Sequence, residues 1–316
     1  MFNVRLFIIS LTSEGNLRMD DLFNKTKGFG EILDHIFQLV KSYFAPFFLI
    51  FLFILGPVFL LEAILLLVSG TSFFRQLGVG SNRFEQIIMG FDEPIFSRAE
   101  EISNMISFAT LVLVPLGMIS ILQAVQKIKD KENFTPGGMI KQASKRFGPV
   151  LGSSLIVGIV FFFTFMIILV AIIVTGVVAF DNSSVAIVIF GLGLLLGISL
   201  LIALWFSRWG FYMAAVYFKE SFPGIGYSWR LTKKNTLRVF GLFLTIGLIT
   251  GIVSAAINGF FGAILGNSVL FSIISNLILI LTYMISAVAY AVIYYDLKVR
   301  QGGEDLQDMI DEYQNE

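Results

Sequence analysis

Cysteine is absent from the sequence, and histidine occurs once, as His35. The lack of cysteine excludes disulfide bonds, thiolate catalysis and cysteine-ligated metals. A histidine-based metal site or catalytic triad would have to be built around His35 alone. We therefore expect no catalytic residue, no metal site and no cofactor.

Charged residues are scarce as well. They make up 14% of the 316 residues, whereas about 25% is usual in soluble domains. Hydrophobic residues account for 56% of the chain, and the mean hydropathy is +0.85. A bilayer can cover this much apolar surface, whereas a soluble fold cannot. The formal net charge of zero gives no reason to expect nucleic acid as a partner.

Enzyme signatures are also missing. The sequence contains no G-x-S-x-G, P-loop or H-E-x-x-H motif, and no paired-carboxylate motif with an obvious partner. We therefore expect a protein that is not an enzyme.

What the chain does contain is long hydrophobic runs, each of about the 20 residues or more that a helix needs to cross a bilayer. They predict an all-α, polytopic membrane protein with six transmembrane helices. These runs lie at about 44–68, 105–125, within 149–180, and at 185–209, 240–265 and 269–293.

The six predicted helices form three hairpin repeats. Each repeat opens at a similar junction, at Tyr43–Pro46, at Arg146–Pro149 and at Phe240–Gly241, after an amphipathic or basic segment. In residues 30–44, for example, apolar side chains recur at helical spacing and charged ones fall on the other face. We therefore expect a cytoplasmic amphipathic helix in the membrane interface before each hairpin.

This pattern divides the chain into three parts. Residues 1–29 are expected to be a disordered cytoplasmic segment, in which either Met1 or Met19 is the start. Residues 30–300 form the transmembrane domain, with an extracytoplasmic loop at 69–104. Residues 301–316 form an acidic cytoplasmic tail.

Lysine and arginine are distributed unevenly between the loops. Six lie between the second and third spans and six between the fourth and fifth, whereas the 181–184 and 266–268 turns have none. Because cytoplasmic loops carry the excess of positive charge, both termini and both basic loops are predicted to be cytoplasmic.

Polar side chains inside the spans are informative because they are expensive there. Glu62 lies 18 residues after Phe44, and Asn258 lies 18 residues after Phe240, so the two occupy equivalent positions in two repeats. Asn276 should lie at a similar depth. We predict one cluster of Glu62, Asn258 and Asn276, which either fixes the helix register or binds a proton or substrate.

A second polar pair is predicted at the inner membrane interface. Arg208 ends the fourth span, Asp296 ends the sixth, and tryptophan and tyrosine residues flank both. An ion pair between Arg208 and Asp296 would lock these two helix ends together.

Basic residues precede the third and fifth spans. Their spacing of four places them on one stripe of a helix, where they are either a topology signal or contacts for anionic lipid headgroups. These residues are Lys141 and Lys145 in one segment, and Arg230, Lys234 and Arg238 in the other.

The stretch 205–300 carries Trp209, Tyr212 and Glu220, then the sequence SWRLT at 228–232, Phe240-Gly241, and YDLKVR at 295–300. It resembles the bacterial membrane-domain family named after the membrane region of glycerophosphoryl diester phosphodiesterases. The resemblance implies a multi-span domain of the bacterial cytoplasmic membrane, found fused to a phosphodiesterase or alone. Since the sequence shows no phosphodiesterase domain, it implies no hydrolase activity here.

Two functions stay open. The leading interpretation is a non-enzymatic scaffold or accessory subunit that binds an unknown membrane protein. The alternative is a transporter or lipid-handling protein with a polar site around Glu62. A cavity lined by Glu62, Asn258 and Asn276 would favour the alternative, and an intramembrane enzyme would need a second carboxylate or a metal beside Glu62.

Overall fold

The computed structural model describes residues 26–75, 98–182 and 185–315, and this part of the chain is all α-helical. Six of its helices are long and apolar enough to cross a membrane, as predicted. The helices are α2 (Phe29–Ser42), α3 (Phe44–Val68), α5 (Arg98–Lys129), α6 (Pro136–Ser144), α7 (Phe147–Asn182), α8 (Val185–Ser207), α9 (Tyr212–Tyr217), α10 (Ile225–Thr232), α11 (Thr236–Leu265) and α12 (Val269–Asn315).

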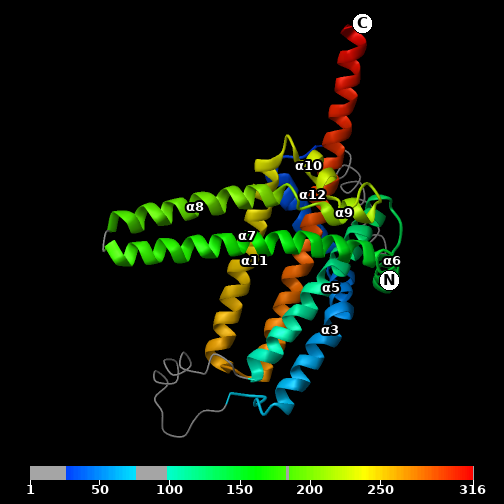
Figure 1. Cartoon of the computed structure of the whole chain (residues 1–316). Helices are drawn as coiled ribbons and strands as arrows, with labels where there is room; N and C mark the ends of the chain where they lie inside the picture. Colours follow the sequence, from blue (N-terminus) through cyan, green and yellow to red (C-terminus); the bar gives the residue numbers. More distant parts are fainter. Residues whose placement is uncertain (1–25, 76–97, 183–184, 316) are drawn as a thin grey trace, which may run out of the picture.

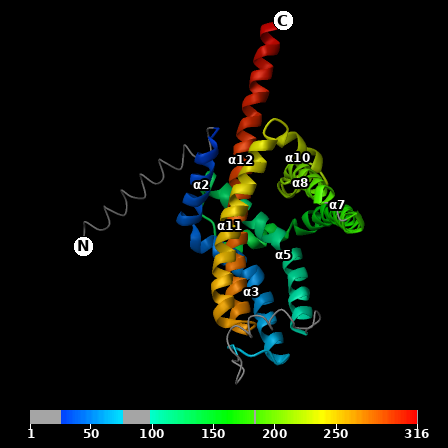
Figure 2. The same cartoon turned by 90° about the vertical axis from the view of Figure 1, so that its left-hand side faces the viewer.

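Four of the long helices, α3, α5, α11 and α12, run side by side as a bundle (Figures 1 and 2). Helix α12 contacts α3, α5 and α11, as well as the shorter α2 and α10. Every residue from 287 to 297 is buried, so this stretch of α12 is covered on all sides. A helix that is apolar all round is expected in such a central position.

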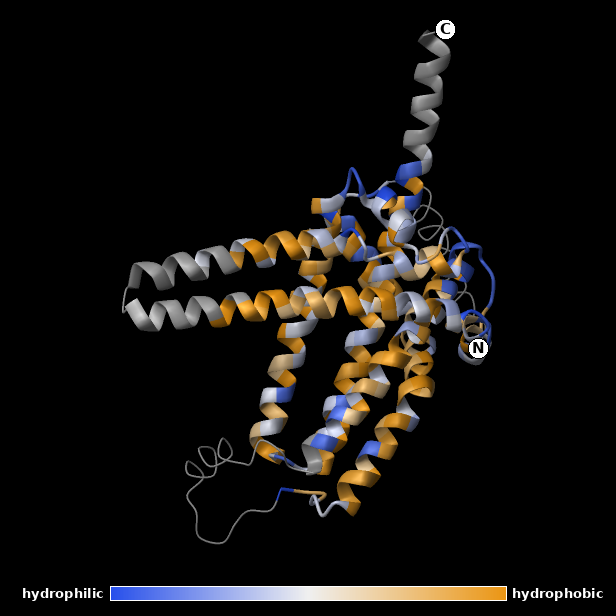
Figure 3. Cartoon of the chain, viewed as in Figure 1, coloured by the Kyte–Doolittle hydropathy of each residue, from blue (hydrophilic) through white to orange (hydrophobic). Residues whose placement is uncertain are grey.

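The two ends of the bundle differ in chemistry (Figure 3). One end carries α2, α6, α9 and α10 (Figures 1 and 2) together with hydrophilic connecting segments (Figure 3). The other end carries the turn between α11 and α12, where the N–H groups of Val269 and Leu270 donate to the carbonyls of Ser72 and Phe73 at 3.1 Å. The segment after α3 thus caps the start of α12.

The α7–α8 hairpin lies across the bundle instead of along it (Figures 1 and 2). In the most apolar part of α7, only 11% of the residues are buried, against 61% in α12. The two helices contact each other, and rings such as Phe161 and Phe206 stack between them. The prediction of six spans rested on length and hydropathy. Those properties are present in all six helices, but α7 and α8 do not share the bundle's direction.

Helix bounds also differ from the predicted boundaries. Helix α5 begins at Arg98, inside the predicted 69–104 loop, and α12 continues without a break into the predicted tail as far as Asn315. Residues 76–97, the rest of the predicted extracytoplasmic loop, and residues 1–25 lie outside the described part of the chain.

Helix α2 was expected to lay its apolar face in the membrane interface. Instead Ile32, Ile36 and Leu39 are fully buried, and α2 contacts α12, α3 and α11. Protein therefore covers this face. The interfacial position of α2, α6 and α10, which precede the three hairpins, stays a prediction, and so does the repeat itself.

The close approach of α3 and α5 gives a test of the packing. A methyl group on Gly117 would overlap the ring of Phe51, which is fully buried and stacks on Tyr283. We expect Gly117→Ala to destabilise the protein by about 1–3 kcal/mol, the usual cost of overpacking a core. Denaturant unfolding in detergent measures this change.

The matched control is Gly251→Ala on α11, where nothing lies within 4 Å of the added methyl. This change should be neutral or mildly stabilising, because alanine favours a helix over glycine by up to about 1 kcal/mol. Equal stabilities of the two variants would show that α3 and α5 are not packed this closely.

Candidate functional site

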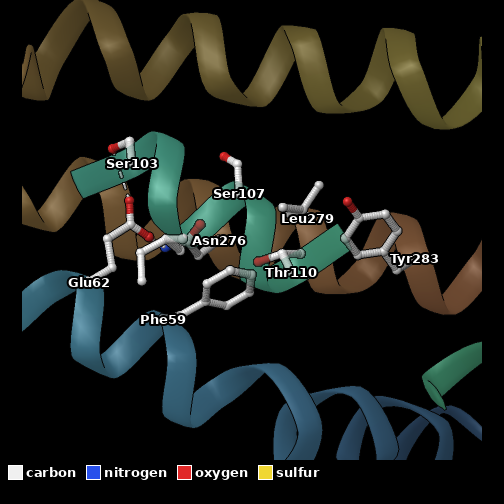
Figure 4. Close-up of a pocket in the computed structure, with 9 residues that line it drawn as sticks. Phe59, Glu62, Ser103, Ser107, Thr110, Asn276, Leu279 and Tyr283 are labelled. Atoms are coloured by element: carbon white, nitrogen blue, oxygen red, sulfur yellow. Dashed lines mark hydrogen bonds between the residues drawn. The ribbon is translucent and has the colours of Figure 1, made fainter. Parts of the chain in front are cut away.

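A cavity of about 120 Å³ lies between α3, α5 and α12, within the apolar part of the bundle. Side chains from all three helices converge on it (Figure 4). They are Phe59 and Glu62 from α3, Ser103, Ile106, Ser107 and Thr110 from α5, and Asn276, Leu279 and Tyr283 from α12.

Glu62 is the only charged residue among those that line the cavity, and its exposed fraction is 5%. Both carboxylate oxygens accept hydrogen bonds: Oε2 from the amide of Asn276 at 2.7 Å, and Oε1 from the hydroxyl of Ser103 at 3.1 Å. The structure therefore brings Glu62 and Asn276 together. Both donors are neutral, so the carboxylate is held without a charged partner in the cavity wall.

Three hydroxyl residues of α5 line the cavity at a spacing that places them on one face of the helix. Ser103, Ser107 and Thr110 occupy positions i, i+4 and i+7. Ser107 is exposed and marks the open side of the cavity, whereas Thr110 is 3% exposed.

The Thr110 hydroxyl has no hydrogen-bond partner within the described protein. Threonines elsewhere in the long helices, including Thr164, Thr250 and Thr282, donate to the carbonyl four residues earlier. A buried hydroxyl that makes no hydrogen bond costs free energy. The Thr110 hydroxyl is therefore free to bond a ligand of the cavity.

Asn258 does not belong to this site, so the predicted cluster of three is wrong in one member. Its amide donates to the Ser254 carbonyl at 2.9 Å, and its oxygen accepts from Ser275 at 2.7 Å. Successive residues of a helix point about 100° apart. Ser275 therefore faces α11 while Asn276 faces α3, and equal depth did not bring Asn258 to Glu62.

A second polar cluster, the Asp296 cluster, joins the start of α2 to α11 and α12. The Asp296 carboxylate accepts from the Lys27 backbone N–H at 3.0 Å and from Arg300 Nε at 2.8 Å, and Arg238 lies 4.0 Å away. The Lys27 carbonyl accepts from Arg300 at 2.6 Å and also from Arg238. Lys27 is thus held at both of its peptide groups.

The Lys27 side chain is itself buried and donates to Nδ1 of His35. Desolvation lowers the pKa of Lys27 from 10.5 to about 8, against the attraction of Asp296 and Glu31. Desolvation, and then the charge of Lys27, lower the pKa of His35 to about 3. His35 is therefore neutral at pH 7, and its Nδ1 accepts a hydrogen bond from the Lys27 ammonium.

The predicted ion pair between Arg208 and Asp296 is not formed. Arg208 Nε donates to Thr236 Oγ1 at 2.9 Å, and its guanidinium lies 4.5 Å from the centre of the Trp229 ring. Its carbonyl accepts from Ser228 of α10 at 2.6 Å. The chain after α8 thus folds onto α10 and the start of α11, and Arg208 makes its contacts there.

The basic residues do not form the predicted stripe before the fifth span. Helix α10 ends at Thr232 and α11 begins at Thr236, so Arg230, Lys234 and Arg238 belong to no common helix. Arg230 and Lys234 are exposed, but Arg238 is turned inward to Lys27 and Asp296. Arg238 is therefore not a free headgroup contact.

Lys141 and Lys145 are exposed at the end of α6 and just after it. Contact of these two lysines with lipid headgroups stays a prediction.

Sequence reasoning named Glu62 and Asn276 but missed the polar side chains that α5 brings to the cavity wall. Ser103, Ser107 and Thr110 repeat at helical spacing in an apolar segment, and this pattern could have marked the polar face of α5. Nothing in the sequence could have paired Lys27 with Asp296, because 269 residues separate them.

No family model matches the chain, and no curated protein or solved structure matches it either. The resemblance of residues 205–300 to the phosphodiesterase membrane-domain family stays a prediction. Among the described residues, no group of three or more His, Cys, Asp or Glu side chains is placed to hold a metal ion.

The Asp296 cluster predicts which pairs couple energetically. Asp296→Ala should cost about 2–4 kcal/mol, because it leaves Arg300 and Arg238 facing each other without their carboxylate. The free energy of unfolding of Asp296→Ala, Arg300→Ala and the double variant, measured in detergent, should be strongly non-additive.

The matched cycle uses Arg208→Ala in place of Arg300→Ala. Since Arg208 is bound elsewhere, its effect should add to that of Asp296→Ala within about 0.5 kcal/mol. Coupling of Asp296 to Arg208 and not to Arg300 would contradict the structure.

Proposed function

We propose that this protein is a non-enzymatic membrane protein of the transport class that binds a small polar solute or ion in the Glu62 cavity. One observation supports this above all: a cavity with a buried carboxylate and a buried, unpartnered hydroxyl lies among three long apolar helices. Ionisable groups at such depth are costly and are characteristic of substrate and ion pathways.

The size of the cavity limits the class of solute that it can bind. A volume of 120 Å³ corresponds to about four water molecules, at about 30 Å³ each. A lipid headgroup with its glycerol is larger than this. The cavity therefore favours transport over lipid handling, the other half of the alternative set out from the sequence.

A scaffold or accessory subunit is the second candidate, and the α7–α8 hairpin favours it. The hairpin projects from the bundle (Figure 1) and exposes large apolar side chains, among them Phe162, Phe163 and Leu201. Either lipid or a membrane protein partner can cover this surface. The Glu62 cavity distinguishes the candidates, because a scaffold has no use for an open polar site there.

The absence of native cysteine makes a direct test of transport simple. Ser107→Cys places one thiol on the open side of the cavity. A transport protein exposes its site to each side of the membrane in turn, so a membrane-impermeant thiol reagent should label this variant in both right-side-out and inside-out vesicles.

The control is Ser120→Cys, on the same helix but fully buried and bonded to the Leu116 carbonyl at 2.7 Å. It should stay unlabelled in both preparations. Labelling of Ser107→Cys from one side alone, or from neither, would contradict transport and leave the scaffold.

We also propose a bacterial cytoplasmic membrane, with both chain ends in the cytoplasm. The basic segments around α6 and α10 share one end of the bundle, and the 266–268 turn, which has no Lys or Arg, lies at the other (Figure 1). With the excess of positive charge inside, the first end is cytoplasmic. External reagent should label Asn267→Cys and not Lys233→Cys, and the opposite result would invert the orientation.

A further inference from the structure

The Glu62 cavity has an unbalanced charge. Its wall holds one carboxylate and no Lys, Arg or His among the nine residues that line it. Both oxygens of Glu62 act as acceptors, from Asn276 and Ser103. Neutral donors orient this charge but do not cancel it. In an apolar surrounding, a proton on Glu62 or a bound cation can supply the balance, and the oxygen-lined space beside Glu62 favours a cation.

The remaining polar groups suit a hard cation. The Thr110 hydroxyl oxygen is buried without a partner, and Ser107 and Tyr283 bring two more hydroxyls to the same wall (Figure 4). Hydroxyl, carboxylate and water oxygens are the ligands of hard cations. A divalent ion of this type is usually held by several carboxylates or by phosphates, whereas one carboxylate balances one positive charge.

The dimensions require water beside the ion. Ser103 and Thr110 are seven residues apart on α5, which is about 10 Å along the helix axis. A single ion cannot contact both ends, but a volume of 120 Å³ holds an ion together with about three waters. Such waters can bridge the ion to Thr110.

We propose that the Glu62 cavity binds a partly hydrated monovalent cation of about the size of sodium. Glu62 supplies the charge, Asn276 and Ser103 hold its carboxylate in place, and Ser107 and Thr110 supply oxygens for the ion or its waters. This assignment rests on the binding role proposed for the cavity and names the class of its ligand.

The test is the thermal unfolding midpoint of the full chain in detergent, in sodium, potassium or choline chloride at one ionic strength. A ligand that binds the folded state alone raises the midpoint saturably. Sodium should raise it relative to choline, and Glu62→Gln should abolish this difference. Thr110→Val should raise the half-saturating sodium concentration about five-fold, the equivalent of one hydrogen bond.

The matched control is Thr250→Val, the same change at a buried threonine that donates to the carbonyl of Ile246 in its own helix. It should keep the full sodium response. If Glu62→Gln does not fold, Glu62→Asp keeps the charge on a shorter side chain and should alter the preference between sodium and potassium.

A midpoint independent of the cation, or a sodium response that persists in Glu62→Gln, would overturn the assignment. So would stabilisation by acid alone, because the charge would then be balanced by a proton on Glu62. The outcome of the labelling test for transport is independent of the outcome of the sodium test. A sodium response with one-sided labelling of Ser107→Cys means a bound ion without transport, and two-sided labelling without that response means transport of another ligand.

Discussion

Helix α12 determines where the other bundle helices lie, because it is buried along most of its apolar length. Two hydrocarbon-like surfaces gain little from meeting each other inside a bilayer, so close packing has to hold the helices together. Small side chains at Ala287, Ala289 and Ala291 let neighbours approach this stretch of α12. Phe47 and Phe51 of α3 fill space in the same core. The polar clusters are located where α12 meets its neighbours.

The two polar clusters satisfy their carboxylates in different ways. Asp296 is surrounded by Arg300 and Arg238, so its charge is balanced by the chain itself. Glu62 receives two hydrogen bonds and no positive charge from the wall of its cavity. A carboxylate whose cationic partners belong to the same chain is what a structural joint needs. An unbalanced one beside open space is what a binding site needs, and this contrast separates the roles of two similar side chains.

Much of the fold follows from hydropathy, because a helix in hydrocarbon needs a long apolar run and little else. Depth arithmetic also brought Glu62 to Asn276, since a residue 18 positions after the inner end of the first span and one near the outer start of the sixth lie at a similar depth. It failed for Asn258 and for Arg208, because depth does not include rotation about the helix axis. Lys27 shows a further limit of sequence-based prediction. Its backbone N–H binds the distant Asp296 carboxylate, and a backbone contact of this kind does not depend on which side chain the residue carries. The direction of the α7–α8 hairpin likewise depends on packing that hydropathy does not contain.

One unbroken helix carries residues of both clusters. Asn276 and Asp296 are 20 residues apart on α12, which corresponds to about 30 Å along its axis. A helix without an internal break behaves as a stiff rod over this length, since sharp bends need an identifiable cause. A sliding or rolling motion of α12 that loosens Asn276 from Glu62 would therefore pull Asp296 against the arginines and Lys27 at the other end. The contacts of the Asp296 cluster would therefore limit how far α12 can move.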